Sequence, residues 1–220
     1  MTIAYFKFST SVPWDKALFA HLMSELPLNF QRPILKYRRW QDAQASLIGK
    51  ILLKRLLNTK YNINSLPTIQ YSQHGKPFFT DLPLLDFNIS HSGEFVVVAM
   101  VHDTKVGIDI ERIENIDFID FHEVFTHQER LNLIKSNQKI QLFYSYWVKK
   151  EAILKACGKG LTTPLNEVCA IDNLAFAADE KWLLVELNLA EDYICYVATN
   201  NLRRTLSIEL LQATGTDILL

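Results

Sequence analysis

The segment VGIDIER, Val106 to Arg112, places two carboxylates two residues apart. If this segment forms a strand, Asp109 and Glu111 project from one face about 6.6 Å apart. Ile108 and Ile110 then pack behind them. Carboxylates held side by side repel each other unless a cation lies between them, and a hard ion such as Mg²⁺ is the simplest one. The alternative is an edge strand with two exposed acids, each paired with a lysine.

A further carboxylate and a lysine lie one helical turn apart in WVKKEAILKACGKGL, residues 147–161. At a spacing of four residues, Glu151 and Lys155 share one face of a helix, with Trp147 one turn earlier. Glu151 is therefore a candidate third metal ligand or general base, and Lys155 a candidate partner for a substrate phosphate. The alternative is an ordinary surface ion pair, worth only about 0.3–0.5 kcal/mol.

Two more segments combine polar side chains with turn-forming residues. In FNISHSGEF, residues 87–95, the hydroxyl of Ser90, the imidazole of His91 and the turn amides suit phosphate oxygens. Nucleophilic catalysis by this pair is disfavoured, because adjacent residues of a strand point to opposite faces. In QHGKPFF, residues 73–79, a Gly-Lys-Pro turn presents Lys76, which could contact a phosphate. The alternative for both segments is a solvated surface loop.

The hydrophobic patterns predict an α+β protein whose elements position these motifs. Strands rich in β-branched and aromatic residues are expected over residues 3–8, 95–101, 106–110, 182–187, 193–199 and 206–210. Helices are expected over residues 42–57 and about 128–157, with Asp42 capping the first and Gly158 ending the second. The order is strand, helix, strand, followed by strand, helix, strands.

This order divides the chain into two similar halves, residues 1–104 and 105–220. His102 to Thr104 form a natural hinge between them. No convincing sequence repeat links the halves, so any internal symmetry would be structural only.

The charge balance excludes some functions. The chain has 220 residues, with 23 Lys and Arg against 24 Asp and Glu, so a wholesale nucleic-acid binder is not expected. The charges are uneven, because residues 32–60 hold eight basic residues and one acid, whereas residues 107–129 hold seven acids and one arginine. A basic first half suits phosphate or an acidic partner, and an acidic second half suits a cation. The alternative is two solvated faces.

The cysteine pattern and the apolar runs indicate a cytoplasmic protein. Three cysteines, an odd number without CxxC spacing, argue against a disulfide framework or a zinc site and fit a reducing compartment. The first ten residues lack the apolar core of a signal peptide. The longest apolar run, residues 95–101, is far shorter than the roughly 20 residues of a membrane span. No membrane association is expected.

Taken in order, GKP, FNISHSG, GIDIE and WxxKExxxK followed by GKGL resemble the motifs of Sfp-type 4′-phosphopantetheinyl transferases. The likeness covers residues 37–164. It implies a monomer of two similar α/β halves related by pseudo-two-fold symmetry, with the active site and coenzyme A in the cleft between them. Members of this family move the phosphopantetheine arm of coenzyme A to a serine of an acyl- or peptidyl-carrier protein. The carrier is expected to bind near residues 159–165.

The resemblance also implies a metal site and catalytic residues. Mg²⁺, with Mn²⁺ as an alternative, would be ligated by Asp109, Glu111 and Glu151. Glu151 would take the proton from the carrier serine, and Lys155 would contact the phosphate being transferred. The predicted catalytic residues are therefore Glu151, Lys155 and Asp109.

The nucleotide phosphates of coenzyme A would be held by Lys76, Ser90, His91 and Lys155. Family members usually carry an arginine where this chain has Ala45. The cations that would meet the 3′-phosphate in its place are Lys36, Arg38 or Arg39. Glu129, in the segment VFTHQER, aligns with a family acid near the site and would have a supporting role.

Two other functions remain open at this point. A coenzyme A or carrier-protein binding module could keep the fold and lose turnover, although the three acids and Lys155 speak against it. A Mg²⁺-dependent phosphohydrolase would explain the carboxylates but not the order of the motifs.

Overall fold

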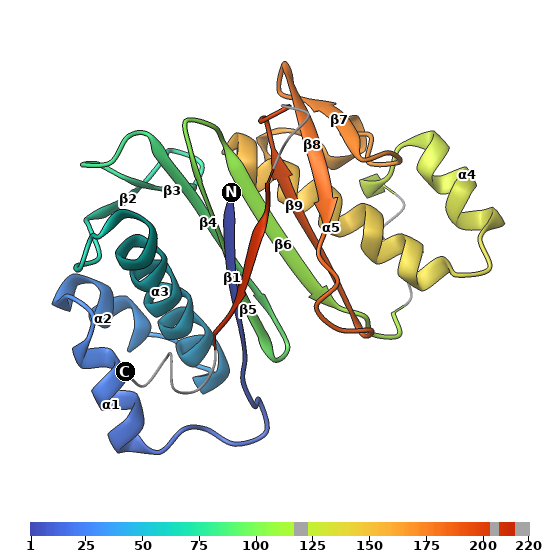
Figure 1. Ribbon diagram of the computed structural model, residues 1–220. Helices are drawn as coiled ribbons and strands as arrows, with labels where there is room; N and C mark the ends of the chain where they lie inside the picture. Colours follow the sequence, from blue (N-terminus) through green and yellow to red (C-terminus); the bar gives the residue numbers. More distant parts are fainter. Residues whose placement is uncertain (117–122, 203–206, 214–220) are drawn as a thin grey trace.

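The computed structural model describes residues 1–116, 123–202 and 207–213 and has an α+β fold. Its main elements form two similar halves, each with a four-stranded sheet and one long helix packed against it. Figure 1 shows the halves side by side, with α3 on the outside of one and α5 on the outside of the other.

The first half consists of a sheet covered by helices. Strands β4, β5 and β1 are antiparallel neighbours, and β10 extends this sheet in parallel with β1. Their bounds are Thr2–Lys7 for β1, Leu85–Ser92 for β4, Phe95–His102 for β5 and Glu209–Gln212 for β10. The helices are α1 (Lys16–Ser24), α2 (Leu28–Ile34) and α3 (Trp40–Tyr61). A hairpin of β2 (Ile69–Tyr71) and β3 (Pro77–Phe79) follows α3.

The second half repeats this arrangement with an antiparallel sheet in the order β6-β9-β8-β7. The strands are β6 (Val106–Arg112), β7 (Leu174–Ala177), β8 (Glu180–Glu186) and β9 (Tyr193–Thr199). The helices are α4 (His127–Lys135) and α5 (Lys139–Cys157), followed by the short 3₁₀ turns Gly160–Thr162 and Leu165–Glu167. Within the described ranges, no helix combines the length and apolarity needed to cross a membrane.

The central strand β5 is buried on both faces. Val96 on β5 belongs to the core beneath α3, whereas its neighbours Val97 and Ala99 pack with Ile108 in the core between the sheets. The far face of the second sheet, including Trp182, packs against α5. Because both faces of β5 are covered, its sequence is an uninterrupted apolar run rather than an alternating one.

Strands β4 and β6 belong to different sheets, and side chains of β4 join them. We call this contact the seam; it consists of β6 and four residues of β4, namely Asp86, Asn88, Ser90 and Ser92. Asp86 Oδ2 accepts the amide N–H of Val106 at 2.8 Å, and Asn88 Oδ1 accepts that of Ile108 at 3.0 Å. Ser92 Oγ accepts the N–H of Arg112 at 3.1 Å. Residues two apart in a strand share a face, so alternate polar side chains of β4 replace a partner strand for β6.

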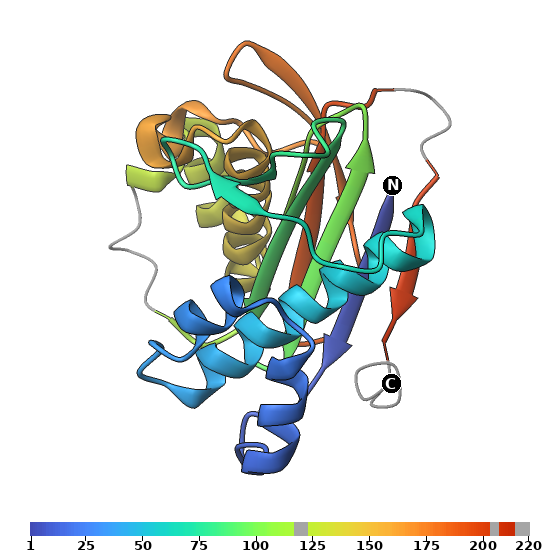
Figure 2. The same cartoon turned by 90° about the vertical axis from the view of Figure 1, so that its left-hand side faces the viewer.

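Lys76 fastens the β2–β3 hairpin to the seam. Its ammonium donates to Asp86 Oδ2 at 2.6 Å, to the carbonyl of Ala156 at 2.8 Å and to that of Val106 at 3.3 Å. All three hydrogens of the ammonium are therefore used. Gly158, the left-handed C-cap of α5, lies against the stem of this lysine. The hairpin consequently extends from the end of α3 to the end of α5, as Figure 2 shows.

Gly107 allows α5 to lie directly on β6. A Cβ atom at this position would come within 2.1 Å of the carbonyl oxygen of Ala152 and 2.3 Å of the amide nitrogen of Ala156. These are backbone atoms, so no side-chain rotation could relieve the overlap. The close approach determines how near the side chains of α5 come to those of β6.

The structure confirms the α+β class, the two similar halves and the strands expected near residues 3–8, 95–101, 106–110, 182–187 and 193–199. Ile108 and Ile110 pack behind the two acids as expected. Gly158 ends α5 as expected. The pattern-based expectations did not include β2, β3, β4, β7 or the first two helices. Strand β4 carries polar side chains at alternate positions, and the other elements are short or irregular in their hydrophobic periodicity.

Several boundaries were wrong. The single helix expected over residues 128–157 is two helices, because Ser136 has an extended backbone that lets Leu133 fold back toward Phe143. The first long helix starts at Trp40, with Arg39 rather than Asp42 at its N-cap. The strand expected over residues 206–210 begins at Glu209, where it pairs with Thr2, and Leu206 lies outside the described residues.

We predict that Gly107→Ala lowers the free energy of unfolding by about 3 kcal/mol or more, because the added methyl group forces α5 away from β6. Urea unfolding followed by circular dichroism measures this. Gly75→Ala is the control, since no atom lies within 4 Å of its added Cβ and only its positive φ of 84° is strained. That variant should lose about 1 kcal/mol. Equal losses in the two variants would contradict the packing argument.

Candidate active site

Asp109 is the point where β4, β6 and α5 meet. Its side chain is almost fully buried, and its Oδ1 atom accepts hydrogen bonds from Lys155 Nζ at 2.5 Å and from Ser90 Oγ at 2.9 Å. Lys155 also donates to Ser90 Oγ at 3.1 Å. The second oxygen, Oδ2, is buried and has no hydrogen-bond partner among the described residues. A buried carboxylate oxygen without a donor is unfavourable, so this atom is free to bind a ligand.

The site is built by the packing of α5. One face of this helix, including Ala152 and Ala156, packs on the second sheet, and Gly107 brings it close to β6. Glu151 and Lys155, one turn apart, lie on the face that borders the seam. Lys155 bonds to Asp109 rather than to Glu151, so the ordinary i,i+4 surface pair is not what the structure contains.

The negative charge of Asp109 contributes to raised pKa values at the other two acids, Glu111 and Glu151. Burial raises the pKa of Glu111, partly offset by the hydrogen bond that Ser92 Oγ donates to its Oε2 at 2.8 Å, and the charge of Asp109 adds to the increase. Burial, followed by the charge of Asp109, also raises the pKa of Glu151, while Lys155 opposes this shift. Among the described residues, three carboxylates therefore share one region with a single ion-paired ammonium, that of Lys155.

The donor chemistry of this region fits a hard divalent cation. In the part of the chain that the structure describes, no three His, Cys, Asp or Glu side chains converge as a ready-made metal site. Mg²⁺ does not require such a cage, since it usually binds through one or two carboxylates together with waters and substrate phosphates. The unpartnered Oδ2 of Asp109 is a suitable first ligand. Glu111 and Glu151 stay predicted as further ligands.

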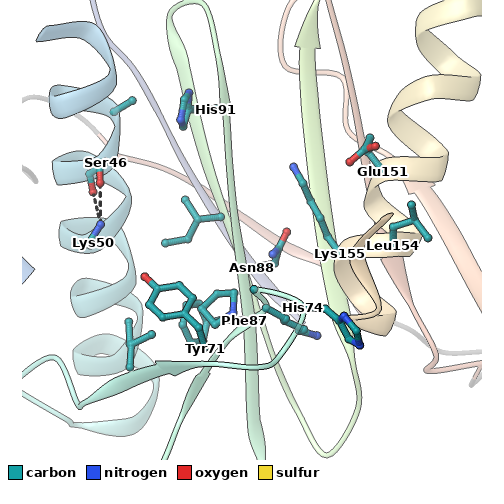
Figure 3. A pocket seen from close by; sticks show the side chains of 18 of the residues that line it. Ser46, Lys50, Tyr71, His74, Phe87, Asn88, His91, Glu151, Leu154 and Lys155 are labelled. Carbon is teal, nitrogen blue, oxygen red and sulfur yellow. Dashed lines mark hydrogen bonds between the residues drawn. The ribbon is translucent and has the colours of Figure 1, made fainter. Parts of the chain in front are cut away.

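A cavity of about 370 Å³ lies beside these acids. Figure 3 shows its walls, with α3 carrying Ser46 and Lys50 on one side and α5 carrying Glu151 and Lys155 on the other. Strand β4 and the β2–β3 hairpin complete the lining with apolar, aromatic and polar groups, among them Tyr71, His74, Phe87, Asn88 and His91. A volume of this size, mostly apolar with a few charged groups, is typical of a small-molecule site.

Of the residues predicted to bind phosphate, some lie at the seam and others border the cavity. Ser90 faces the seam and His91 the cavity, as expected for neighbours in a strand. Burial lowers the pKa of His91, and the negative charge of Asp42 partly offsets this decrease. Lys76 borders the cavity with its ammonium already bonded to Asp86. Their roles toward phosphate stay predictions.

The basic residues before α3 lie apart from these groups. Lys36, Arg38 and Arg39 are exposed, and none of the three lines the cavity. Their contact with a phosphate stays a prediction. Lys50, which sequence reasoning did not select, does line the cavity. The signal was present in the sequence, because Lys50 lies one helical turn after Ser46 and close to the Ala45 position.

Glu129 forms a fully buried ion pair with Lys150, the residue before Glu151, with an Nζ–Oε2 distance of 2.8 Å. Its supporting role stays a prediction. Glu129 Oε1 accepts the amide of Ala170 at 2.7 Å, and Lys150 donates to the carbonyls of Leu165 and Val168 at 2.8 and 2.6 Å. Every strong donor and acceptor of the pair is therefore satisfied. The pair thus joins α4, α5 and the loop that follows α5. Sequence reasoning identified Glu129 but not this lysine.

These features define a class of protein with two similar α/β halves and an acidic centre at the seam between them. Two family profiles match the chain, one for the N-terminal part of 4′-phosphopantetheinyl transferases over residues 13–103 and one for the 4′-phosphopantetheinyl transferase superfamily over residues 105–198. The chain belongs to the 4′-phosphopantetheinyl transferase superfamily, and its relatives are of the Sfp type. The predicted resemblance is thereby confirmed.

The curated relatives agree with the profiles. The transferase gsp of Aneurinibacillus migulanus is 37% identical over 69% of this chain and 64% of its own length. The transferase ffp of Bacillus subtilis is 33% identical over 66% of each chain, and Sfp of Bacillus subtilis strain 168 is 35% identical over 57% of each. The matches thus span less than two thirds of these relatives' length.

We predict that Glu111→Gln raises the melting temperature at pH 8 by about 2 °C in the absence of metal. Because the folded pKa of Glu111 is raised, its ionisation destabilises the folded protein at every pH above that pKa. The penalty disappears below the unfolded pKa of about 4.3, so the gain should vanish near pH 4. Calorimetry at both values tests this, with the exposed Glu167→Gln as control. A gain of equal size at pH 4 and pH 8 would rule out charge as its cause.

Proposed function

We propose that this protein transfers the 4′-phosphopantetheine group of coenzyme A to a serine of an acyl- or peptidyl-carrier protein. The observation that carries this proposal is the position of Glu151 and Lys155 at the wall of a ligand-sized cavity, with Asp109 paired to Lys155 behind it. Membership of the superfamily supports it. A coenzyme A binding module without turnover is the less favoured alternative, because all the acids and the lysine are present.

In the proposed reaction, the serine hydroxyl oxygen forms a bond to the phosphorus that carries the pantetheine arm. The bond from that phosphorus to the bridging oxygen of the pyrophosphate breaks, and 3′,5′-adenosine bisphosphate leaves with the electron pair. The serine proton is transferred to a carboxylate. This chemistry needs charge neutralisation and in-line positioning more than covalent catalysis.

Glu151 is the proposed acceptor of the serine proton. It lines the cavity, and its carboxylate makes no hydrogen bond or ion pair within the described part of the chain. Its raised pKa makes the ionised carboxylate a stronger base than that of an ordinary glutamate. General base catalysis of this kind is typically worth 10²–10⁴-fold.

Lys155 is proposed to stabilise the negative charge of the transferred phosphoryl group. Its ammonium lies between Asp109 and the cavity, and its side chain is 30% exposed, so a phosphate oxygen can reach it. Asp109 and Ser90 fix the orientation of this ammonium through their hydrogen bonds. A cation held in place before the substrate binds needs no reorganisation during the reaction.

A divalent cation, proposed to be Mg²⁺ with Mn²⁺ as an alternative, would be held by Asp109 together with Glu111 or Glu151. When bound, it would neutralise charge on the pyrophosphate oxygens of coenzyme A. The unpartnered Oδ2 of Asp109 and the raised pKa values of the two glutamates support this assignment.

We also propose an oligomeric state, a division of roles between the two halves and a cellular location. We infer a monomer in which residues 1–104 contribute phosphate binding and residues 105–220 contribute the acids and the carrier contact, with β10 of the latter segment crossing back to pair with β1 in the first sheet. The unpaired thiols of Cys157, Cys169 and Cys195 support a cytoplasmic location. No nucleic-acid or membrane partner is proposed.

We predict that Glu151→Gln folds normally and slows transfer at least 100-fold, because it removes the base without changing the volume of the side chain. Intact-mass spectrometry of an apo acyl-carrier protein incubated with coenzyme A and Mg²⁺ measures the gain of one phosphopantetheine. The exposed Glu191→Gln serves as control and should retain wild-type turnover. Wild-type turnover by Glu151→Gln would refute its role. If wild-type protein binds coenzyme A but modifies none of several carriers, the binding module becomes the better assignment.

We further predict that Asp109→Asn raises the Mg²⁺ concentration needed for half-maximal transfer about tenfold or more, because an amide is a much weaker ligand for a hard cation. A Mg²⁺ titration of the transfer rate and a Mg²⁺-dependent thermal shift of the unliganded protein measure this. If both titrations match those of the wild type, Asp109 is not a metal ligand.

A further inference from the structure

The wall of the cavity formed by α3 lacks a cation at the expected position. Sequence reasoning placed a family arginine at Ala45, whose methyl group is buried at this wall. Ser46 and Lys50 lie on the same wall. They are four residues apart, so their side chains lie together on one face of the helix. Lys50 therefore brings an ammonium to a wall from which the arginine is missing.

Lys50 is a partly buried ammonium without an acidic partner. It donates to Ser46 Oγ at 2.8 Å and to the Ser46 carbonyl at 3.3 Å, and no acid forms an ion pair with it within the described residues. Four other buried or partly buried lysines have acids, namely Lys54 with Glu25, Lys76 with Asp86, Lys150 with Glu129 and Lys155 with Asp109. Lys149 also has no acid in an ion pair, but it does not line the cavity and lies over the ring of Tyr196. Burial lowers the pKa of Lys50 to about 8, which is the expected effect when an ammonium loses water and gains no anion.

The position of Lys50 separates it from the reacting centre. In Figure 3 it lies on the α3 side of the cavity, across from Glu151 and Lys155 on α5, with His91 on β4 between the two walls. Coenzyme A carries its negative charge in two places, the pyrophosphate and the phosphate monoester on the ribose. If the pyrophosphate lies at Lys155, the monoester is the anion left for the opposite wall.

We propose that Lys50, assisted by the hydroxyl of Ser46, binds the 3′-phosphate of coenzyme A and replaces the arginine missing at position 45. This inference rests on the proposed function of the same site. A doubly charged phosphate would supply the anion that Lys50 lacks and would accept the hydrogens that it now donates within its own helix. It follows that the α3 wall, rather than the exposed Lys36, Arg38 and Arg39, distinguishes coenzyme A from its 3′-dephospho form.

Isothermal titration of coenzyme A and 3′-dephospho-coenzyme A into the full chain tests this proposal. We expect the wild type to prefer coenzyme A, and Lys50→Met to weaken its binding about 10- to 100-fold, as for a hydrogen bond to a charged group. Binding of the dephospho form should not change. Lys50→Arg should restore the preference, because it restores the charge. Lys50→Gln replaces the methionine variant if circular dichroism shows that the latter is unfolded.

The controls separate this inference from the proposed function. Lys54→Met removes a lysine from the same helix that is paired with Glu25 away from the cavity, and it should keep the preference. A preference that survives in Lys50→Met, or that is lost in Lys36→Met or Arg39→Met, overturns the inference. Equal binding of both ligands by the wild type also overturns it while leaving transfer possible. If the wild type binds neither ligand, the proposed function itself fails.

Discussion

The seam between β4 and β6 is the constraint on which the rest of the structure depends. Two sheets that do not share a ladder are joined because Asp86, Asn88 and Ser92 accept the amide hydrogens of alternate residues of β6. An edge strand with unpaired amides would otherwise be exposed or would lose hydrogen bonds on burial. Side-chain acceptors solve this problem without closing the sheet.

The same strand pair explains why the site is electrostatically strained. Ser90 belongs to the seam, yet its hydroxyl points at Asp109 instead of a backbone amide. Asp109 is buried by the packing of β6 against α5, and its charge is balanced by Lys155 alone at close range. Glu111 and Glu151 lie within its field and are harder to ionise than ordinary glutamates. Such clusters destabilise the folded protein and are typical of functional sites, where a substrate or a cation restores the balance.

The two sides of the cavity differ in how their lysines are neutralised. On the α5 side, Lys155 is already paired with Asp109, so we expect a phosphate to bind there together with a cation. On the α3 side, Lys50 has a hydroxyl and a carbonyl as its only partners in the described structure. A ligand with two separate anionic groups would satisfy both sides. Under our proposal, Lys50, five residues after Ala45 on the same helix, takes the place of the family arginine, rather than the exposed basic residues before α3.

How much the sequence determined can be judged from particular residues. The period-two pattern of VGIDIER and the spacing of Glu151 and Lys155 were sufficient to predict the face on which each lies, because helix and strand geometry depend on local spacing alone. The motif order was sufficient to identify the family. By contrast, the sequence could not show that Lys76 is tied to Asp86, that Lys155 pairs with Asp109, or that Glu129 pairs with Lys150. Each of these contacts joins residues at least ten positions apart, and the last two join β6 or α4 to α5. The pair of Lys155 with Asp109 depends on the close approach of α5 to β6 that Gly107 allows, and only the tertiary structure contains such packing.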